Sequence, residues 1–136
     1  CFYFLSVGDS RICLYRDGAL TQLNREHIYR RELELLAVNG EGNIAEAASH
    51  PRAAGLTSYL GMGQLKYIDQ GDAPVRVLEG DRFVLMSDGV YNALSASELG
   101  SALELSAPEA AAAMDAAIKA HDWPGQDNYT AVVIQC

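Results

Sequence analysis

Three aspartates stand next to apolar runs typical of core strands, and their carboxylates could bind a metal ion. Asp9 follows the run that ends at Val7, Asp88 follows the run 83–86, and Asp127 precedes the run 129–134. Carboxylates at strand ends can converge on one edge of a sheet. Several carboxylates without His or Cys favour hard cations such as Mg²⁺ or Mn²⁺. The pattern therefore predicts a carboxylate-lined cation site.

The same aspartates can also be interpreted as turn residues. Each lies beside a glycine or an asparagine, and an Asp in such a pair often bonds its own backbone. The pairs at 17–18, 71–72 and 80–81 are interpreted as turns only. Spacing alone does not separate them from the three candidate ligands.

Histidine and serine give weaker candidates. His27, His50 and His121 are far apart, have no metal-ligand spacing, and are expected to face solvent or to cap helices. Ser10 and Ser87 lack the G-x-S-x-G setting of a nucleophile and are interpreted as turn residues.

Composition limits the function classes. The 136 residues are 49% apolar, which suits one domain with a core, and no stretch approaches the ~20 apolar residues of a membrane-spanning helix. The net charge of −8 argues against nucleic acid as a partner. Three widely spaced cysteines suit neither a zinc knuckle nor a disulfide framework, so a reducing, cytoplasmic compartment is expected.

The candidate residues must be positioned by a mixture of strands and helices. Strands are expected at residues 1–7, 11–16, 19–23, 65–69, 75–78, 82–86 and 129–134, with a two-residue hairpin turn at Asp17-Gly18. Helices are expected from about residue 24 or 25 to 38, over 44–49, and after the capping boxes Ser95-x-x-Glu98 and Ser106-x-x-Glu109. The chain begins at Cys1 and runs directly into an apolar segment, whereas N-termini are more often polar and frayed. We therefore expect it to be the interior of a longer protein.

Several segments together resemble one enzyme family. Val7-Gly8-Asp9-Ser10-Arg11 precedes the hairpin, Gly80–Val90 contains Ser87-Asp88-Gly89, and Gln126–Val133 begins with Gln-Asp-Asn. In order and spacing they resemble the PP2C-type (PPM) metal-dependent protein serine/threonine phosphatases, and bacterial members in particular. Leu56–Gly61 matches the family's L-T-R-A-L-G region in part.

The resemblance implies an α+β fold, namely part of a PP2C-like αββα sandwich of two antiparallel sheets flanked by helices. Residues 1–136 would be a single, incomplete domain that lacks its N-terminal segment. The implied activity is hydrolysis of phosphoserine and phosphothreonine in a phosphorylated protein substrate by a metal-activated water. Carried over by motif, Asp88 and Asp127 bind the first of two Mn²⁺ or Mg²⁺ ions, and Asp9 with Asp88 binds a third ion weakly. Arg11 is expected to brace its loop.

The sequence departs from the family pattern in three places. The family's upstream Asp-Gly segment and accompanying acids are absent from these residues, so the segment alone is expected to be inactive. Asn92 stands where many members have an acid, and Ser58-Tyr59 replaces Arg-Ala. The alternative is therefore a non-catalytic PP2C-like regulatory or interaction module. No nucleic-acid or membrane partner is expected, and the oligomeric state is left open.

Overall fold

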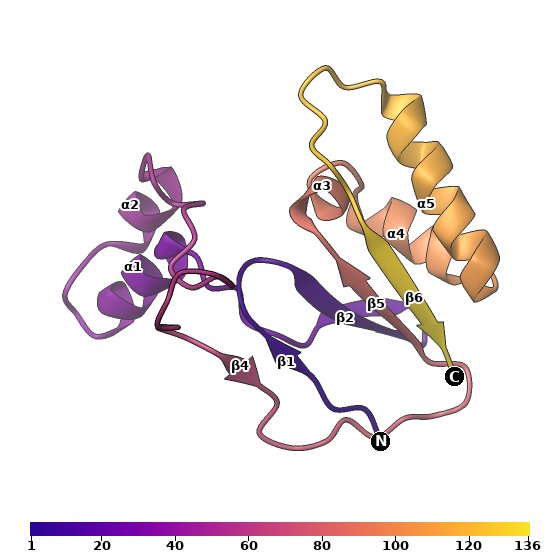
Figure 1. Cartoon of the computed structure of the whole chain (residues 1–136), viewed down its shortest axis with the longest axis horizontal. Coiled ribbons are helices and arrows are strands. Elements are labelled where there is room, and N and C mark those ends of the chain that lie inside the picture. The colour runs from indigo at the N-terminus through magenta and orange to yellow at the C-terminus, as the bar shows by residue number, and fades with distance from the viewer. The chain divides into compact units, whose positions relative to one another are not determined.

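A computed structural model describes all 136 residues, which form two compact units (Figure 1). Unit 1 comprises Cys1–Phe4, Ser10–Asn24 and Gly71–Cys136, and unit 2 comprises Leu5–Asp9 and Arg25–Gln70. Each unit is described by itself.

Unit 1 is built on a four-stranded antiparallel sheet. Its strands have the order β3-β2-β5-β6, with the bounds β2 Arg11–Arg16, β3 Ala19–Gln22, β5 Arg82–Met86 and β6 Ala131–Gln135. The hairpin expected at Asp17-Gly18 is confirmed, with φ of 51° and 77° at these two residues. Positive φ at both central positions is what a type I′ turn requires, and the right-handed twist of the strands favours that turn.

Three helices accompany this sheet: α3 (Asp88–Tyr91), α4 (Ala96–Leu103) and α5 (Ala107–His121). Both expected capping boxes are confirmed at the starts of α4 and α5. The two longer helices cover one face of the sheet (Figure 1). Alternate strand residues and the inner helix residues form the core there: Cys13, Tyr15, Val84, Met86, Leu99, Leu103, Met114 and Ile118. None of the helices is long and apolar enough to cross a membrane.

The opposite face of the sheet is covered unevenly. Phe83 in the central strand β5 is fully buried, and its ring stacks on Phe2 with the centroids 4.0 Å apart. By contrast, Val132 and Ile134 on the edge strand β6 are 50% and 39% exposed. This face of the sheet is therefore buried at Phe83, whereas its apolar side chains on β6 are partly exposed to solvent.

Unit 2 contains a two-stranded antiparallel sheet of β1 (Leu5–Ser6) and β4 (Asp69–Gln70) and the helices α1 (Tyr29–Val38) and α2 (Ile44–Ser49). The side chain of Asn43 caps α2 by accepting the N–H of Ala45. Antiparallel sheets with accompanying helices confirm the expected α+β class.

Several expected elements are shorter than their apolar runs. The run 1–7 contributes only β1, the run 65–69 contributes only the start of β4, and 75–78 forms a single bridge from Val75 to Phe2. An apolar run signals burial, but a ladder also needs a partner of matching length. The first helix starts at Tyr29 rather than at 24 or 25, and α3 was not expected because four residues carry no helical period.

Asp81 is more than the turn residue that the sequence suggested. Its side chain is buried and accepts two hydrogen bonds from the Arg16 guanidinium, at 2.8 and 2.7 Å, and one from the Leu78 N–H at 2.7 Å. Arg16 also donates to the carbonyl of Arg76. The carboxylate thus joins the end of β2 to the loop that enters β5. These bonds, above all those from Arg16, hold the pKa of Asp81 below its usual value.

Replacing Asp81 with Asn should lower the free energy of unfolding by about 2–4 kcal/mol, because it breaks a buried ion pair and leaves Arg16 without its partner. The matched control is Asp17→Asn, which makes the same change in an exposed turn whose left-handed backbone Asn also accepts. It should change stability by no more than about 0.5 kcal/mol. Urea unfolding measures both, and equal effects would contradict the anchoring role of Asp81.

The contribution of this ion pair should also depend on pH. Because folding lowers the pKa of Asp81, its stabilisation is fully present above the unfolded pKa of about 4 and is lost as pH falls through the folded pKa. The stability difference between the unmodified chain and Asp81→Asn should therefore shrink below about pH 4. A difference that stayed constant down to pH 2 in urea titrations would refute this.

Candidate functional site

The pairing of β5 with β6 brings the Asp88 and Asp127 segments together. The ladder ends at Met86 opposite Ala131, and Ser87 and Thr130 continue it with two hydrogen bonds. The Ser87 N–H donates to the Thr130 carbonyl at 3.0 Å, and the Thr130 N–H donates to Ser87 Oγ at 2.9 Å. The loop after β5 and the loop before β6 therefore meet at one end of the sheet.

Gly89 allows these two loops to touch. It is buried, and a Cβ added to it would lie 2.3 Å from the carbonyl oxygen of Asn128 and 3.0 Å from its carbon. No side chain fits at that separation. Gln126 adds a polar contact, because its Nε2 donates to the carbonyls of Gly89 at 2.8 Å and of Asp127 at 2.9 Å.

The two candidate aspartates of unit 1, Asp88 and Asp127, are oriented by the backbone of the residue that follows each of them. Asp88 is half-buried and its Oδ1 accepts the Gly89 N–H at 2.9 Å, whereas Asp127 is exposed and its Oδ1 accepts the Asn128 N–H at 2.7 Å. These are the bonds of the turn interpretation. Since they use one oxygen of each carboxylate and fix its direction, turn geometry and metal ligation are compatible here.

Arg11 and Asn92 both contact the short helix α3, which carries Asp88. The Arg11 guanidinium lies over the Tyr91 ring, 3.7 Å from its centroid, and Tyr91 belongs to the same short helix as Asp88. Arg11 thus braces the helix that carries Asp88. Asn92 ends that helix, is exposed, and donates its backbone N–H to the Asp88 carbonyl.

Asp9 belongs to unit 2, where it follows β1. The preceding Gly8 has a φ of +105°, a conformation that side chains rarely adopt. His27 holds this glycine from both sides: its N–H donates to the Gly8 carbonyl at 2.8 Å, and its Nδ1 accepts the Gly8 N–H at 3.1 Å. His27 is buried, so the expectation that it faces solvent or caps a helix was wrong. Burial lowers its pKa, which favours the neutral ring that can accept this bond.

Ser58, which departs from the family pattern, has a structural part in unit 2. It is fully buried, donates its hydroxyl to the Tyr67 carbonyl at 2.7 Å and accepts the Tyr67 N–H at 3.1 Å. The adjacent Thr57 N–H donates to the His27 carbonyl. Nothing in the sequence pattern indicated the roles of His27 and Ser58, because both depend on contacts between distant segments.

The donor set of the site fits part of a divalent cation centre. Asp88 and Asp127 offer hard carboxylate oxygens, which Mg²⁺ and Mn²⁺ prefer. However, no group of three or more His, Cys, Asp or Glu side chains in the chain is arranged to hold a metal ion. The two aspartates alone therefore do not make up a complete metal site.

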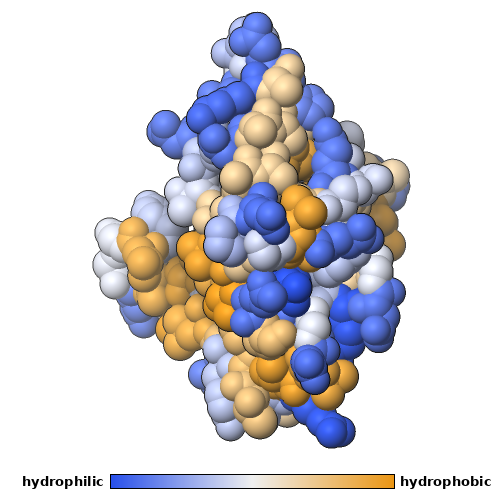
Figure 2. All heavy atoms as spheres, turned by 90° about the vertical axis from the view of Figure 1, so that its right-hand side faces the viewer, coloured by the Kyte–Doolittle hydropathy of each residue, from blue (hydrophilic) through white to orange (hydrophobic).

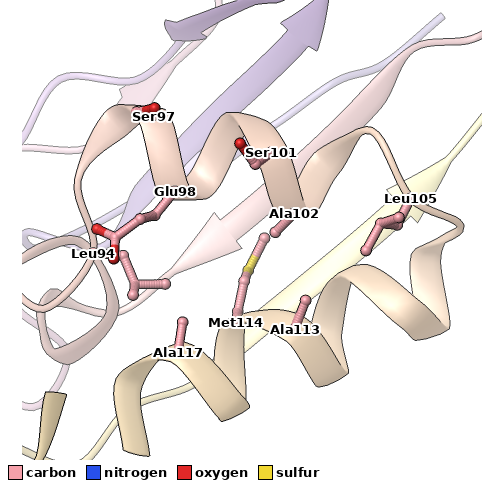
Figure 3. A pocket seen from close by; sticks show the side chains of 9 residues that line it. All are labelled: Leu94, Ser97, Glu98, Ser101, Ala102, Leu105, Ala113, Met114 and Ala117. Atoms are coloured by element: carbon pink, nitrogen blue, oxygen red, sulfur yellow. The ribbon is translucent and has the colours of Figure 1, made fainter. Parts of the chain in front are cut away.

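An apolar groove lies elsewhere in unit 1, between α4 and α5, with a volume of about 370 Å³ (Figure 3). Leu94, Ala102 and Met114 line it, and Glu98 lies at one end. His121 Nε2 contacts Glu98 at 2.8 Å. Figure 2, seen from the α5 side, shows apolar surface broken up by polar side chains. Because none of the candidate ligands lines the groove, we do not place the site there.

Comparison with known proteins gives consistent relatives. No protein-family model matches the chain. Protein phosphatase PhpP of Streptococcus pneumoniae is 31% identical over 131 residues, which is 96% of this chain and 51% of PhpP. A crystal structure of the S. agalactiae serine/threonine phosphatase matches with a TM-score of 0.78 and 31% identity, covering 98% of this chain and 54% of that one.

A third match bears on the metal. The catalytic domain of the serine threonine protein phosphatase PstP, solved in complex with two manganese ions, matches with a TM-score of 0.58 and 26% identity, over 96% of this chain and 51% of that one. The chain spans about half the length of most curated relatives that it matches. In sequence and in fold, the chain is similar to PP2C-type (PPM) protein serine/threonine phosphatases and matches the C-terminal part of their domain.

Proposed function

We propose that this segment supplies part of the metal centre of a protein serine/threonine phosphatase, with Asp88 and Asp127 as ligands of the first ion. The observation that carries the proposal is the β5–β6 register, which places both aspartate loops at one end of the sheet. Asp9 is proposed as a ligand of a third, weakly bound ion. The catalytic domain of PstP, which the chain resembles, was solved in complex with two manganese ions, and this supports the proposal.

The proposed reaction is hydrolysis of phosphoserine and phosphothreonine esters in proteins. Bound Mn²⁺ or Mg²⁺ would supply charge neutralisation and a water of lowered pKa. The proposed role of this chain is to hold the carboxylates of Asp88 and Asp127 in fixed directions, through hydrogen bonds from the N–H groups of Gly89 and Asn128. The chain has a net charge of −8, which repels a phosphate group. Ions at these positions would supply local positive charge and so reduce this repulsion.

Residues 1–136 are proposed to be part of a single phosphatase domain rather than the whole of it. Val132 and Ile134 leave the edge strand β6 apolar and half-exposed, which suits a sheet face that another segment of the domain covers. Asp88 and Asp127 also form no complete metal site by themselves. The segment alone should therefore have negligible activity, and Mn²⁺-dependent phosphatase turnover by residues 1–136 alone would contradict this.

A cytoplasmic location is part of the proposal. All three cysteines are free thiols, which suits a reducing compartment. Proteins with phosphorylated serine or threonine are the proposed partners, and the acidic balance continues to disfavour nucleic acid.

A non-catalytic regulatory module is the second candidate, and Asn92 is the observation that favours it. Its side chain is exposed four residues after Asp88, where an amide replaces the acid of many family members. An amide oxygen is a weaker ligand because it carries no charge. Calorimetric titration of the complete gene product with Mn²⁺ discriminates: negligible binding would favour the non-catalytic module.

Asp88→Asn and Asp127→Asn should each lower Mn²⁺-dependent phosphatase activity of the complete protein by at least about 100-fold, the upper end of what losing an outer-sphere partner costs. Asp72→Asn is the matched control, because it makes the same change on an exposed loop of unit 1 and should retain activity. Hydrolysis of a phosphothreonine peptide measures all three. Full activity in either ligand variant would overturn the assignment.

Gly89→Ala should destabilise the protein by about 1–3 kcal/mol and weaken Mn²⁺ binding, because the new Cβ would force the Asp88 and Asp127 loops apart. Gly100→Ala is the control: its Cβ would sit 3.7 Å from the Tyr15 ring, an ordinary contact, and Ala favours the helix α4. Chemical denaturation and Mn²⁺ titration are the measurements. If Gly89→Ala behaved like Gly100→Ala in both, the close approach of the loops would be refuted.

A further inference from the structure

We propose that Gln126 is a positioning residue whose side-chain amide sets the spacing between the Asp88 and Asp127 loops and so tunes their affinity for a divalent cation. The inference rests on the proposed function, since it takes these two aspartates as ligands. It gives a role to a residue that is not one of the three candidate aspartates and for which the sequence predicted none.

The geometry makes Gln126 a bridge between the loops. Its Nε2 donates one hydrogen to the carbonyl of Gly89, directly after Asp88, and the other to the carbonyl of Asp127, at 2.8 and 2.9 Å. A primary amide has two N–H donors, so this contact uses both. One rigid planar group thus fixes the distance between the backbones of the two loops.

The bridge takes over where the β-ladder stops. The last backbone bond of the β5–β6 pair runs from the Ser87 N–H to the Thr130 carbonyl. Beyond it no backbone bond joins Gly89 to the facing loop, and the Gly89 carbonyl needs a partner because Gly89 is buried. Gln126 provides that partner from a side chain.

The amide oxygen and nitrogen of Gln126 both indicate that this residue positions the two loops and does not itself bind the cation. Oε1 is buried and accepts no hydrogen bond from the protein, so the two donated bonds alone orient the amide. Nε2 faces two carbonyls and carries no lone pair for a cation. Gln126 is therefore assigned to positioning rather than to metal ligation.

The test compares Gln126→Met with Gln22→Met in the complete protein. Methionine keeps the unbranched shape but removes the donors. Gln22 is a matched control because its half-buried Nε2 also donates to a backbone carbonyl, that of Asn24 at 3.0 Å, on another strand of unit 1. In calorimetric Mn²⁺ titrations, Gln126→Met should raise the Kd about tenfold, the scale of losing an outer-sphere partner, whereas Gln22→Met should leave it unchanged.

A second measurement follows the bridge without metal. Hydrogen–deuterium exchange of the Ser87 and Thr130 amides should become about three- to tenfold faster in Gln126→Met and should not change in Gln22→Met. Faster exchange with an unaltered Kd would overturn the tuning of affinity. Unaltered exchange, or equal effects of both substitutions on Kd, would overturn the bridge itself.

These outcomes are distinct from failure of the proposed function. If the unsubstituted protein bound no Mn²⁺, the metal centre would be refuted, and with it the inference about affinity. If Gln126→Met did not fold, shown by loss of its circular dichroism spectrum while Gln22→Met folded, the residue would have a global structural role and the positioning assignment would be overturned.

Discussion

The antiparallel register of β5 with β6 is the constraint on which the candidate site depends. Asp88 and Asp127 are far apart in sequence, and their loops meet only because Met86 pairs with Ala131 and Ser87 with Thr130. A slip of one residue would turn every side chain of β6 to the other face of the sheet. The core packing of Ala131 and Val133 against the helix side opposes such a slip. The packing of the sheet therefore also determines where the two proposed ligands lie.

The two ends of β5 use aspartate in opposite ways. At the entry, Asp81 is buried and its oxygens are taken up by Arg16 and Leu78, so its charge is neutralised within the protein. At the exit, Asp88 is only half-buried and its recorded bond is to the neighbouring Gly89 N–H. An internally neutralised carboxylate stabilises the fold, whereas one without a cationic partner creates a demand for positive charge. The same residue type thus anchors one end of the strand and, at the other end, is the proposed ligand of a cation.

Local patterns in the sequence were sufficient for the central elements. The strand at 82–86, the Asp17-Gly18 turn and the two capping boxes are each signalled by residues close in sequence, and all three predictions were confirmed. The runs 1–7 and 75–78 form less strand than predicted, because strand length depends on the partner: 1–7 contributes β1, and 75–78 contributes one bridge from Val75 to Phe2. The structural roles of His27 and Gln126 were not predicted for a related reason: each side chain bonds to backbone groups of another segment.

The positions of Asp88 and Asp127 along the chain have a thermodynamic consequence. They stand at the two ends of the segment that contains α3, α4 and α5. An ion bound to both would therefore act as a cross-link that closes one long loop around all the helices of unit 1. If the ion stayed bound to the unfolded chain, closing this loop would lower the conformational entropy of the unfolded state. If the ion bound only the folded chain, unfolding would require its release. Binding of such an ion would thus be linked to the docking of the helix pair through chain connectivity, without any direct contact between them.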